Sequence, residues 1–401
     1  MISRAYVFIN GIEDEPLICG IVELDTARYR GRFRYGKSYL SHPAAFALDP
    51  VNLPLSDQEY STTFQQGVFG VLSDAGPDAW GQKIILSLHR TKPQNRLEFL
   101  LAGSGMGVGA LTFSLSRSAT KPKINQNTLG QLPTLLQTKD AILANKTLAP
   151  EAKKVFEYGA SFGGARPKTA IEHDGVSYIA KFNRPDDLFN VAAVEHASMQ
   201  MLAELPCCVA HTQVLSTPNG DVLLVRRFDS EIQQPIAHYV SAHALIQIDK
   251  IRPSELNQQY SYGYLAEFST RFSANALDPH DLYYRMVFNA LMGNTDDHTR
   301  NHGFLYHFDT QQWSLAPAFD VLPINNSRQH GLGLGDAGRY ATIENLMSQS
   351  LRFNIKPFKA KRIINQVSEL VAQWPDYFAT KGVCENDIEI LKGIIPHQKW
   401  E

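Results

Sequence analysis

The spacing of apolar and polar positions changes character along the chain. Residues 5–40 alternate between apolar and polar positions and turn often, which predicts a small antiparallel sheet. Residues 159–229 also favour strands, with one helix inserted over 188–205. Beyond about residue 240 the spacing becomes helical and strand patterns are sparse. A strand-rich first half followed by a mostly helical second half predicts an α+β fold with two lobes and a cleft between them.

One predicted helix leads directly into a strongly polar loop. The helix DPHDLYYRMVFNALM is expected to have Asp278 as its N-cap and Pro279 as its first residue, and to end at Gly293. The loop NTDDHTRN follows, and a hairpin built from GFLYHF, the turn DTQQ and WSLAPAF then reaches Asp320. A loop that follows a buried helix is a rigid place from which to present side chains. Earlier in the chain, Asp74 is expected to cap the N-terminus of another helix.

Length and composition narrow the class of protein. The chain has 401 residues, which indicates two or three domains or a two-lobed enzyme. Its net charge is −2 and its pI about 6.7, so nothing favours non-specific binding to nucleic acid or to an anionic membrane. Cys19, Cys207, Cys208 and Cys384 form no disulfide framework and no metal-knuckle spacing. With no signal peptide and no run of about 20 apolar residues, this predicts a cytoplasmic protein.

The order of polar residues after the helix matches what phosphoryl transfer requires. Asp296 precedes Asn301 by five positions, and Asp320 follows beyond the hairpin. In a kinase one Asp orients or deprotonates the attacking hydroxyl, an Asn holds Mg²⁺, and a second Asp grips the metal ions that bridge the phosphates. Carboxamide and carboxylate oxygens suit Mg²⁺. His298 and His302 are four positions apart, but the segment lacks the glutamate and the helix of a zinc-binding motif.

A candidate phosphate cradle and a cation occur earlier in the chain. The glycine-rich turn GASFGGARPKTAI, residues 159–171, offers backbone amides that could wrap phosphate oxygens. It leads into a hairpin with an Asp-Gly turn at 174–175, whose second strand carries Lys181. Glu195, on the inserted helix, is a candidate ion-pair partner of Lys181. The strand over 220–229 then leads to a segment whose backbone could hydrogen-bond adenine.

A second glycine-rich segment looks like a dinucleotide-binding fingerprint. GSGMGVGALTF, residues 103–113, contains Gly105-x-Gly107-x-x-Ala110. Such a fingerprint needs a strand before it, a helix after it and an acidic residue about 20 positions further on. A strand-like segment and a basic, polar linker follow instead, so the sequence favours a loop that binds no nucleotide.

Taken together, these pieces resemble the HipA-type serine/threonine kinases, which are toxins of bacterial toxin–antitoxin modules. The matching segments are SFGGARPKTA, YIAKF, VRRFD, NTDDHTRN and APAFDVLP, in the family's order and spacing. AYVFINGI and FGVLSDAGPDAWG also resemble the family's N-terminal subdomain. The resemblance covers nearly the whole chain. It implies a kinase-like fold with an N-terminal subdomain over 1–115, the rest of the ATP-binding lobe over 116–240 and a helical catalytic lobe over 241–401.

The resemblance also implies roles for particular residues. Asp296 is the expected catalytic base, Asn301 and Asp320 are the expected Mg²⁺ ligands, and Lys181 is expected to contact the ATP phosphates. Ser161 matches a regulatory serine that the family autophosphorylates. The other expected nucleotide contacts are the phosphate loop Gly163, Gly164, Ala165, Arg166, Pro167 and Lys168, the hinge Arg226, Arg227 and Phe228, and also His298. Three residues depart from the usual family pattern, namely Pro167, Arg226 and Asp297.

The implied function is that of an ATP- and Mg²⁺-dependent serine/threonine protein kinase that arrests growth. The resemblance suggests an aminoacyl-tRNA synthetase as its target, autophosphorylation, and a helix-turn-helix antitoxin as its partner, with DNA contacted only through that antitoxin. Two alternatives stay open. The protein could be an inactive kinase-fold partner of a DNA-binding repressor, or a small-molecule kinase, because the residues alone do not separate a protein acceptor from a small one.

Overall fold

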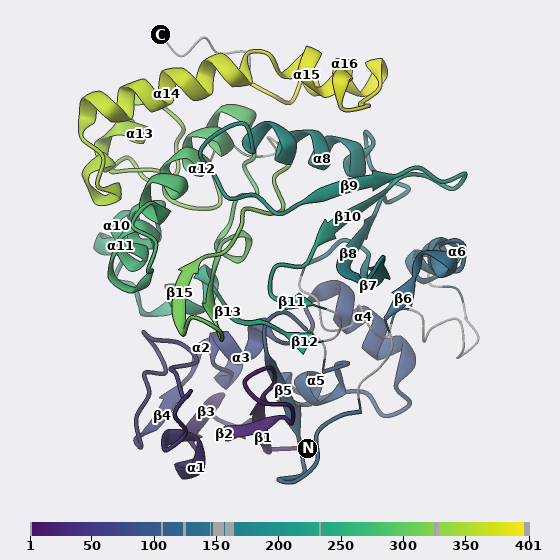
Figure 1. Ribbon diagram of the computed structural model, residues 1–401, viewed down its shortest axis with the longest axis vertical. Coiled ribbons are helices and arrows are strands. Elements are labelled where there is room, and N and C mark those ends of the chain that lie inside the picture. Colours follow the sequence, from purple (N-terminus) through teal and green to yellow (C-terminus); the bar gives the residue numbers. More distant parts are fainter. Residues whose placement is uncertain are drawn as a thin grey trace. The chain divides into compact units, whose positions relative to one another are not determined.

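The structure is a computed structural model, which describes residues 2–105, 107–122, 126–144, 146, 156, 164–231, 234–324, 327 and 329–396 (Figure 1). The chain forms two compact units. The first unit contains Met1–Phe182, Leu224–Leu245 and Leu305–Gln311. The second unit contains Asn183–Leu223, Ile246–Phe304 and Gln312–Glu401. The chain passes between the units within β10 (Val222–Arg226) and within β14 (Gly303–His307).

A five-stranded antiparallel sheet begins the first unit, as the alternation over residues 5–40 predicts. Its strand order is β4-β3-β2-β1-β5. In β3 the alternation buries Phe33 and Tyr35 and leaves three arginines exposed, because successive side chains point to opposite faces of a strand. The strands are β1 (Arg4–Ile9), β2 (Leu17–Asp25), β3 (Arg30–Tyr35), β4 (Glu59–Thr62) and β5 (Leu111–Ser114). The accompanying helices are α1 (Lys37–Leu40), α2 (Phe64–Gly67), α3 (Gly70–Asp74), α4 (Ala79–Leu88) and α5 (Arg96–Ala102).

The start of α4 differs from the prediction that Asp74 caps a helix. Asp74 is instead the last residue of α3, and its carboxylate accepts hydrogen bonds from the N–H and hydroxyl groups of Ser241 at 2.8 and 2.7 Å. Asp78 occupies the N-cap position of α4. The prediction was wrong because a tertiary contact with a distant serine uses the carboxylate that a helix cap would need.

The first unit also contains the hairpin that was predicted around residues 174–175. β7 (Lys168–His173) and β8 (Val176–Phe182) pair in antiparallel order, and Asp174 and Gly175 join them with φ of 49° and 74°. Two consecutive residues with positive φ are typical of the tightest hairpin turn. The strand order is β6-β7-β8-β10. The neighbouring elements of this unit are β6 (Asn127–Thr128), η1 (Leu129–Gln131), α6 (Leu132–Leu143), β11 (Ser230–Glu231), β12 (Gln234–Pro235), β13 (Ala237–Ser241), which lies beside β14, and α9 (Ala242–Leu245).

The second unit is mostly helical, as predicted for the later part of the chain. Its helix α12 (Asp278–Met292) packs against α11 (Tyr262–Phe272) and α14 (Pro357–Val371) (Figure 1). α12 has Pro279 in its first turn and ends before Gly293, whose φ is 68°, as predicted. The predicted N-cap, Asp278, is instead the first residue of the helix and Leu277 occupies the N-cap position, because the Asp278 carboxylate accepts hydrogen bonds from Ser273, Asn275 and the Leu315 N–H. The other helices are α8 (Val191–Leu202), η3 (Ile248–Lys250), η4 (Pro253–Glu255), α10 (Leu256–Gln259), η5 (Thr299–Asn301), α13 (Ile343–Ser348), η6 (Ser350–Phe353), α15 (Trp374–Thr380) and α16 (Glu385–Lys392). The strands are β9 (Thr212–Leu215), which neighbours β10, and β15 (Gln312–Leu315), which neighbours β14.

A buried arginine of α12 fastens the segment that leads to Asp320. Arg285 is 2% exposed and bonds to the Asp281 carboxylate, with its nearest nitrogen 2.5 Å from the oxygen. Its guanidinium also donates to the carbonyls of Ala316 and Cys208, at 3.0 and 3.1 Å. A buried charge is stable only when it is paired and its hydrogen bonds are satisfied. The guanidinium therefore ties the start of the 316–320 segment to the core of the second unit.

Candidate active site

The polar loop over residues 294–302 follows the end of α12 and is tied to it. The Asn294 N–H donates to the Asn289 carbonyl at 2.9 Å, and the two side-chain amides bond at 3.1 Å. The Asn301 side-chain amide donates to the backbone carbonyl of Asp296 at 3.2 Å. Asp296 is exposed, while Asn301 is 8% exposed. The structure thus joins the two residues that the sequence places five positions apart.

A buried carboxylate, that of Asp297, links this loop by hydrogen bonds to residues of the protein interior. It is 1% exposed and accepts hydrogen bonds from the Tyr262 hydroxyl and from Nε2 of His302, the latter at 2.6 Å. The Asn289 amide in turn donates to the Tyr262 hydroxyl at 2.9 Å. Burial alone would raise the pKa of Asp297, but His302 and the Tyr262 hydrogen bond outweigh burial and lower it. Asp297 is therefore held as a buried anion.

The role of Asp297 was missed by the sequence analysis, which saw it only as a departure from a family pattern. Its partner Tyr262 lies on α11, 35 positions earlier, and no local signal links them. The Asp297 bond also engages Nε2 of His302, one of the two histidines considered for zinc. Across the described ranges, no three His, Cys, Asp or Glu side chains are grouped as a metal cluster would need.

Asp320 has a backbone conformation that is uncommon for a residue other than glycine. Its φ is 60°, in the left-handed region, and the side chain is half-buried. Backbone bonds between Ala318 and Cys208 (2.7 Å) and between Ala210 and Ala318 (2.9 Å) hold the segment just before it. Residues of this kind are concentrated at functional sites, where the surrounding structure maintains the conformation.

A small cavity of the second unit brings the loop and Asp320 together. Its volume is about 10 Å³, near the room that one water molecule needs. Its polar lining includes Asn289, Asn294, Asp297, Asn301, His302 and Asp320. The predicted metal-binding pair, Asn301 and Asp320, therefore lines one space. Their carboxamide and carboxylate oxygens fit Mg²⁺, which usually takes one or two protein ligands together with waters and substrate phosphates.

The carboxylates near this cavity affect one another. The pKa of Asp296 is raised, first by partial burial and then by the negative charges of Asp320 and Asp297, while His298 acts in the opposite direction. Within the described part of the chain, Nδ1 of His298 is buried and has no hydrogen-bond partner. A concentration of negative charge of this kind favours a divalent cation.

The predicted phosphate loop belongs to the first unit. Ser161 and Gly163 lie outside the described residues. Gly164, whose φ is 95°, begins the described part, and Ala165, Arg166 and Pro167 lead from it into β7.

Two lysines lie at the base of this loop. Lys168 is directly opposite Lys181 in the β7–β8 ladder. A Cβ atom on Gly164 would lie 2.5 Å from Nζ of Lys168, so the ammonium group folds over the loop. Like charges placed opposite each other in a sheet are unfavourable unless an anion offsets them. The Asp-Gly turn at 174–175 already implied this register, because a two-residue turn pairs residues at equal distances on either side of it.

The predicted hinge is also in the first unit, and its middle residue has other partners. Arg227 is buried, and its guanidinium bonds to Asp229 at 3.0 and 2.8 Å and to the Gly107 carbonyl at 2.8 Å. Its backbone N–H donates to the Ser177 carbonyl at 2.9 Å. Arg226 is exposed at the end of β10, and Phe228 is half-buried.

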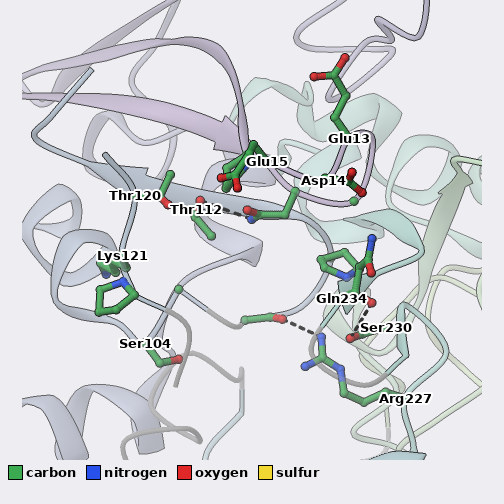
Figure 2. Close-up of a pocket in the computed structure, with 18 residues that line it drawn as sticks. Glu13, Asp14, Glu15, Ser104, Thr112, Thr120, Lys121, Arg227, Ser230 and Gln234 are labelled. Carbon is green, nitrogen blue, oxygen red and sulfur yellow. Dashed lines mark hydrogen bonds between the residues drawn. The ribbon is translucent and has the colours of Figure 1, made fainter. Parts of the chain in front are cut away.

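The glycine-rich segment over 103–113 lines a different cavity, of about 390 Å³, in the first unit (Figure 2). Gly105 and Gly107 line it together with three acidic residues, Glu13, Asp14 and Glu15, and two basic ones, Lys121 and Arg227. Helix α5 precedes this segment and strand β5 follows it, which is the reverse of a dinucleotide-binding unit. The order of elements therefore agrees with the prediction that this segment is no nucleotide fingerprint.

Glu195 has a more definite environment than the sequence indicated. It is 2% exposed on α8 in the second unit. Lys181 belongs to the first unit, so their ion pair stays a prediction. Among the helices of the described residues, none is both long and apolar enough to cross a membrane.

Comparison with known families identifies the family of the chain. Residues 15–114 match the HipA N-terminal domain, and residues 160–374 match the HipA-like C-terminal domain. The second match alone covers more than half of the 401 residues. The chain therefore belongs to the HipA family.

The chain is also similar to solved structures and to a curated protein. HipA of Shewanella oneidensis, solved with HipB and its operator DNA, has a TM-score of 0.67 at 16% identity, covering 96% of this chain and 94% of that one. The Helicobacter pylori kinase CtkA gives 0.42 at 16% identity over 57% of this chain and 88% of its own. A Haemophilus influenzae protein, provisionally named a kinase, is 29% identical over 187 residues. That match spans 42% of this chain and about half (54%) of the relative. The fold is α+β and is shared with the Shewanella HipA structure.

Proposed function

We propose that the protein is an ATP- and Mg²⁺-dependent serine/threonine protein kinase that arrests growth as the toxin of a toxin–antitoxin module. The observation that carries this proposal is that Asn301 and Asp320 line one small cavity of the second unit, while Asp296 bonds to Asn301 through its backbone carbonyl and is close enough for the charge of Asp320 to raise its pKa. The cross-strand lysines Lys168 and Lys181 support it, because two facing cations beside a glycine-rich turn suit the phosphates of ATP.

In the proposed reaction, the hydroxyl oxygen of a serine or threonine attacks the γ-phosphorus of ATP and ADP leaves. Asp296 orients the hydroxyl and accepts its proton, for which its exposed carboxylate is accessible. Asn301 and Asp320 would hold Mg²⁺, which when bound neutralises phosphate charge. Lys168 and Lys181 would bind phosphate oxygens. Because the guanidinium and N–H of Arg227 already have partners, we expect adenine to contact its neighbours, Arg226 and Phe228.

The target and partners are proposed from the family. We infer an aminoacyl-tRNA synthetase as the phosphorylated protein and a helix-turn-helix antitoxin as the partner, with DNA bound only through that antitoxin. The Shewanella relative was solved with HipB and operator DNA, which supports the partner. A cytoplasmic location is in keeping with the four free thiols. The division at residues 115 and 240 into three parts belongs to the same proposal.

One experiment tests the proposed activity. Purified protein is incubated with γ-labelled ATP, Mg²⁺ and cell lysate, and the labelled products are separated by size. We expect one labelled protein band with wild type and a loss of about 10³-fold or more with Asp296→Asn. Label found only in small molecules would favour the small-molecule kinase. No label in any product, from protein that binds ATP, would favour the inactive partner of a repressor.

Autophosphorylation of Ser161 is a separate part of the proposal. A phosphate there would add a charge of about −1.5 to −2 beside the phosphate loop, so the modified protein should bind ATP poorly. Intact mass and peptide mapping after incubation with Mg-ATP test this. We expect one added phosphate on Ser161 in wild type and none in Asp296→Asn. An unmodified 159–168 peptide from protein that phosphorylates a target would reduce Ser161 to a turn residue.

A further inference from the structure

The described part of the phosphate loop, residues 164–168, is held by the start of α4. The Gly164 N–H donates to the Asp78 carboxylate at 3.3 Å, and the Trp80 N–H donates to the Gly164 carbonyl at 3.2 Å. At the other end of the loop, the Trp80 indole N–H donates to the Lys168 carbonyl at 3.1 Å. All of these residues belong to the first unit, so two residues at the start of α4 hold both ends of the loop.

These groups are not needed by α4 itself. Asp78 occupies the helix N-cap position, yet its side chain makes no capping bond to its own helix. The Trp80 side chain is 2% exposed, and its ring meets Phe156 edge-on with centroids 5.6 Å apart. An indole N–H that is buried needs an acceptor, and here the acceptor is the loop. The polar groups of both residues are therefore directed to residues 164–168.

We infer that Asp78 and Trp80, from the N-terminal domain, are positioning residues of the ATP site, which hold the phosphate loop in its binding conformation. This inference rests on the proposed kinase function. The loop backbone is held at Gly164 and Lys168, and Lys168 is the residue that faces Lys181 across the ladder. We call the bonds from Asp78 and Trp80 to the loop the clamp. The clamp therefore fixes the backbone of the turn that would face the phosphates and the backbone of Lys168, one member of the lysine pair.

The physical effect of such a clamp is on binding. Ordering a flexible loop around a ligand opposes binding through lost backbone entropy, and a loop that is already ordered avoids that loss. Neither residue would touch the reacting atoms. Removing a clamp bond should therefore weaken ATP binding while leaving the rate at saturating ATP nearly unchanged.

Trp80→Phe is the first variant, because it keeps an aromatic ring in the core and removes the indole N–H together with the five-membered ring. Asp78→Ala removes the acceptor for Gly164, and Asp78→Asn keeps an oxygen acceptor there. The probe is a non-hydrolysable ATP analogue with Mg²⁺, measured by calorimetry on the full chain. We expect its Kd to rise by up to about tenfold in Trp80→Phe and in Asp78→Ala, and Asp78→Asn to restore most of the affinity. Labelling of lysate protein at saturating ATP should stay within about twofold of wild type.

Two controls separate this inference from a general loss of structure. Asp57→Ala removes an exposed carboxylate of the same unit and should leave the Kd unchanged. Trp374→Phe changes a tryptophan of the second unit and should also leave the Kd unchanged. If Trp80→Phe fails to fold, the Kd values of Asp78→Ala and Asp78→Asn test the inference on their own.

The outcomes distinguish the inference from the function on which it rests. Wild-type protein that binds no analogue overturns the proposed function and this inference with it. Wild-type protein that binds and transfers phosphate, beside Trp80→Phe and Asp78→Ala with unchanged Kd, overturns the inference alone. The inference also fails if both variants lose the saturated rate but keep the Kd.

Discussion

Two loops carry the proposed chemistry, and they are held in different ways. The loop over 294–302 is held partly by its own residues, because Asn301 bonds to Asp296 and His302 bonds to Asp297, each five positions apart. Asn289 and Tyr262, from helices of the same unit, hold the rest of it. The loop over 164–168 is held by residues 86 and 88 positions earlier in the chain. The first loop is held by its own residues and by neighbouring helices of the second unit, whereas the second is held by Asp78 and Trp80 of the N-terminal domain.

This difference predicts different consequences of mutation. Breaking a bond within the 294–302 loop should disturb the catalytic groups or the stability of the second unit. Breaking a bond to the 164–168 loop should disturb ATP binding. The variants below test each side of the comparison.

The largest effect is expected at Asp320. Asp320→Asn and Asp320→Ala should each reduce phosphoryl transfer by about 10³-fold or more, because a positioned charge is lost. Asn tolerates the left-handed conformation, so only Asp320→Ala should also lower the free energy of unfolding, by about 1 kcal/mol. Single-turnover rates and urea unfolding measure both quantities, with Asp376→Asn as the control outside the site. More than a tenth of the wild-type rate in Asp320→Asn would exclude it as a metal ligand.

Asp297 tests whether the 294–302 loop is stabilised by its buried anion. Asp297→Asn should lower the free energy of unfolding by about 3 kcal/mol at pH 7, because His302 and Tyr262 lose a charged partner. The pKa of Asp297 is lowered in the folded state, so its stabilisation is present above about pH 4 and is lost as the pH falls through the folded pKa. Urea unfolding at several pH values should show the difference from wild type shrinking in acid. A difference that does not depend on pH would contradict the anionic role.

Substitution of Lys181 tests whether the lysine pair beside the 164–168 loop binds the phosphates of ATP. Lys181→Met should weaken binding of a non-hydrolysable ATP analogue by about 10- to 100-fold, since a charged hydrogen bond to phosphate is lost. Lys168→Met should have a similar effect, because the two lysines face each other in the ladder. Calorimetry measures the affinity, and Lys361→Met, exposed on α14, is the matched control. If both variants bound the analogue with unchanged affinity, the lysine pair would have no role in ATP binding.

The smallest effect is expected at the hairpin turn. Gly175→Ala should lower the free energy of unfolding by about 1 kcal/mol, because φ of 74° is unfavourable for a residue with a Cβ. Affinity for the ATP analogue should change little, since β7 and β8 keep their register. Thermal unfolding and calorimetry measure the two effects. A loss of affinity as large as that of Lys181→Met would mean that the turn, rather than α4, positions the loop.

The sequence by itself determined the parts whose causes are local. The ends of α12 were predictable because Pro279 and Gly293 act on the backbone within one turn. The hairpin over 168–182 was predictable because Asp174 and Gly175 accept the positive φ of a tight turn. Alternation over residues 5–40 predicted the first sheet, and the spacing of Asp296, Asn301 and Asp320 indicated phosphoryl transfer.

Only the tertiary structure decided which distant groups hold the site. Asp74 fits a helix cap by sequence but binds Ser241, 167 positions later. Asp297 is an anion because Tyr262 and His302 surround it, and Trp80 is directed to Lys168 by the packing of α4. A hydrogen bond between remote residues depends on the path of the whole chain, which local spacing does not specify. Side-chain type therefore indicates the chemistry available at a position, and the packed core decides which partner it meets.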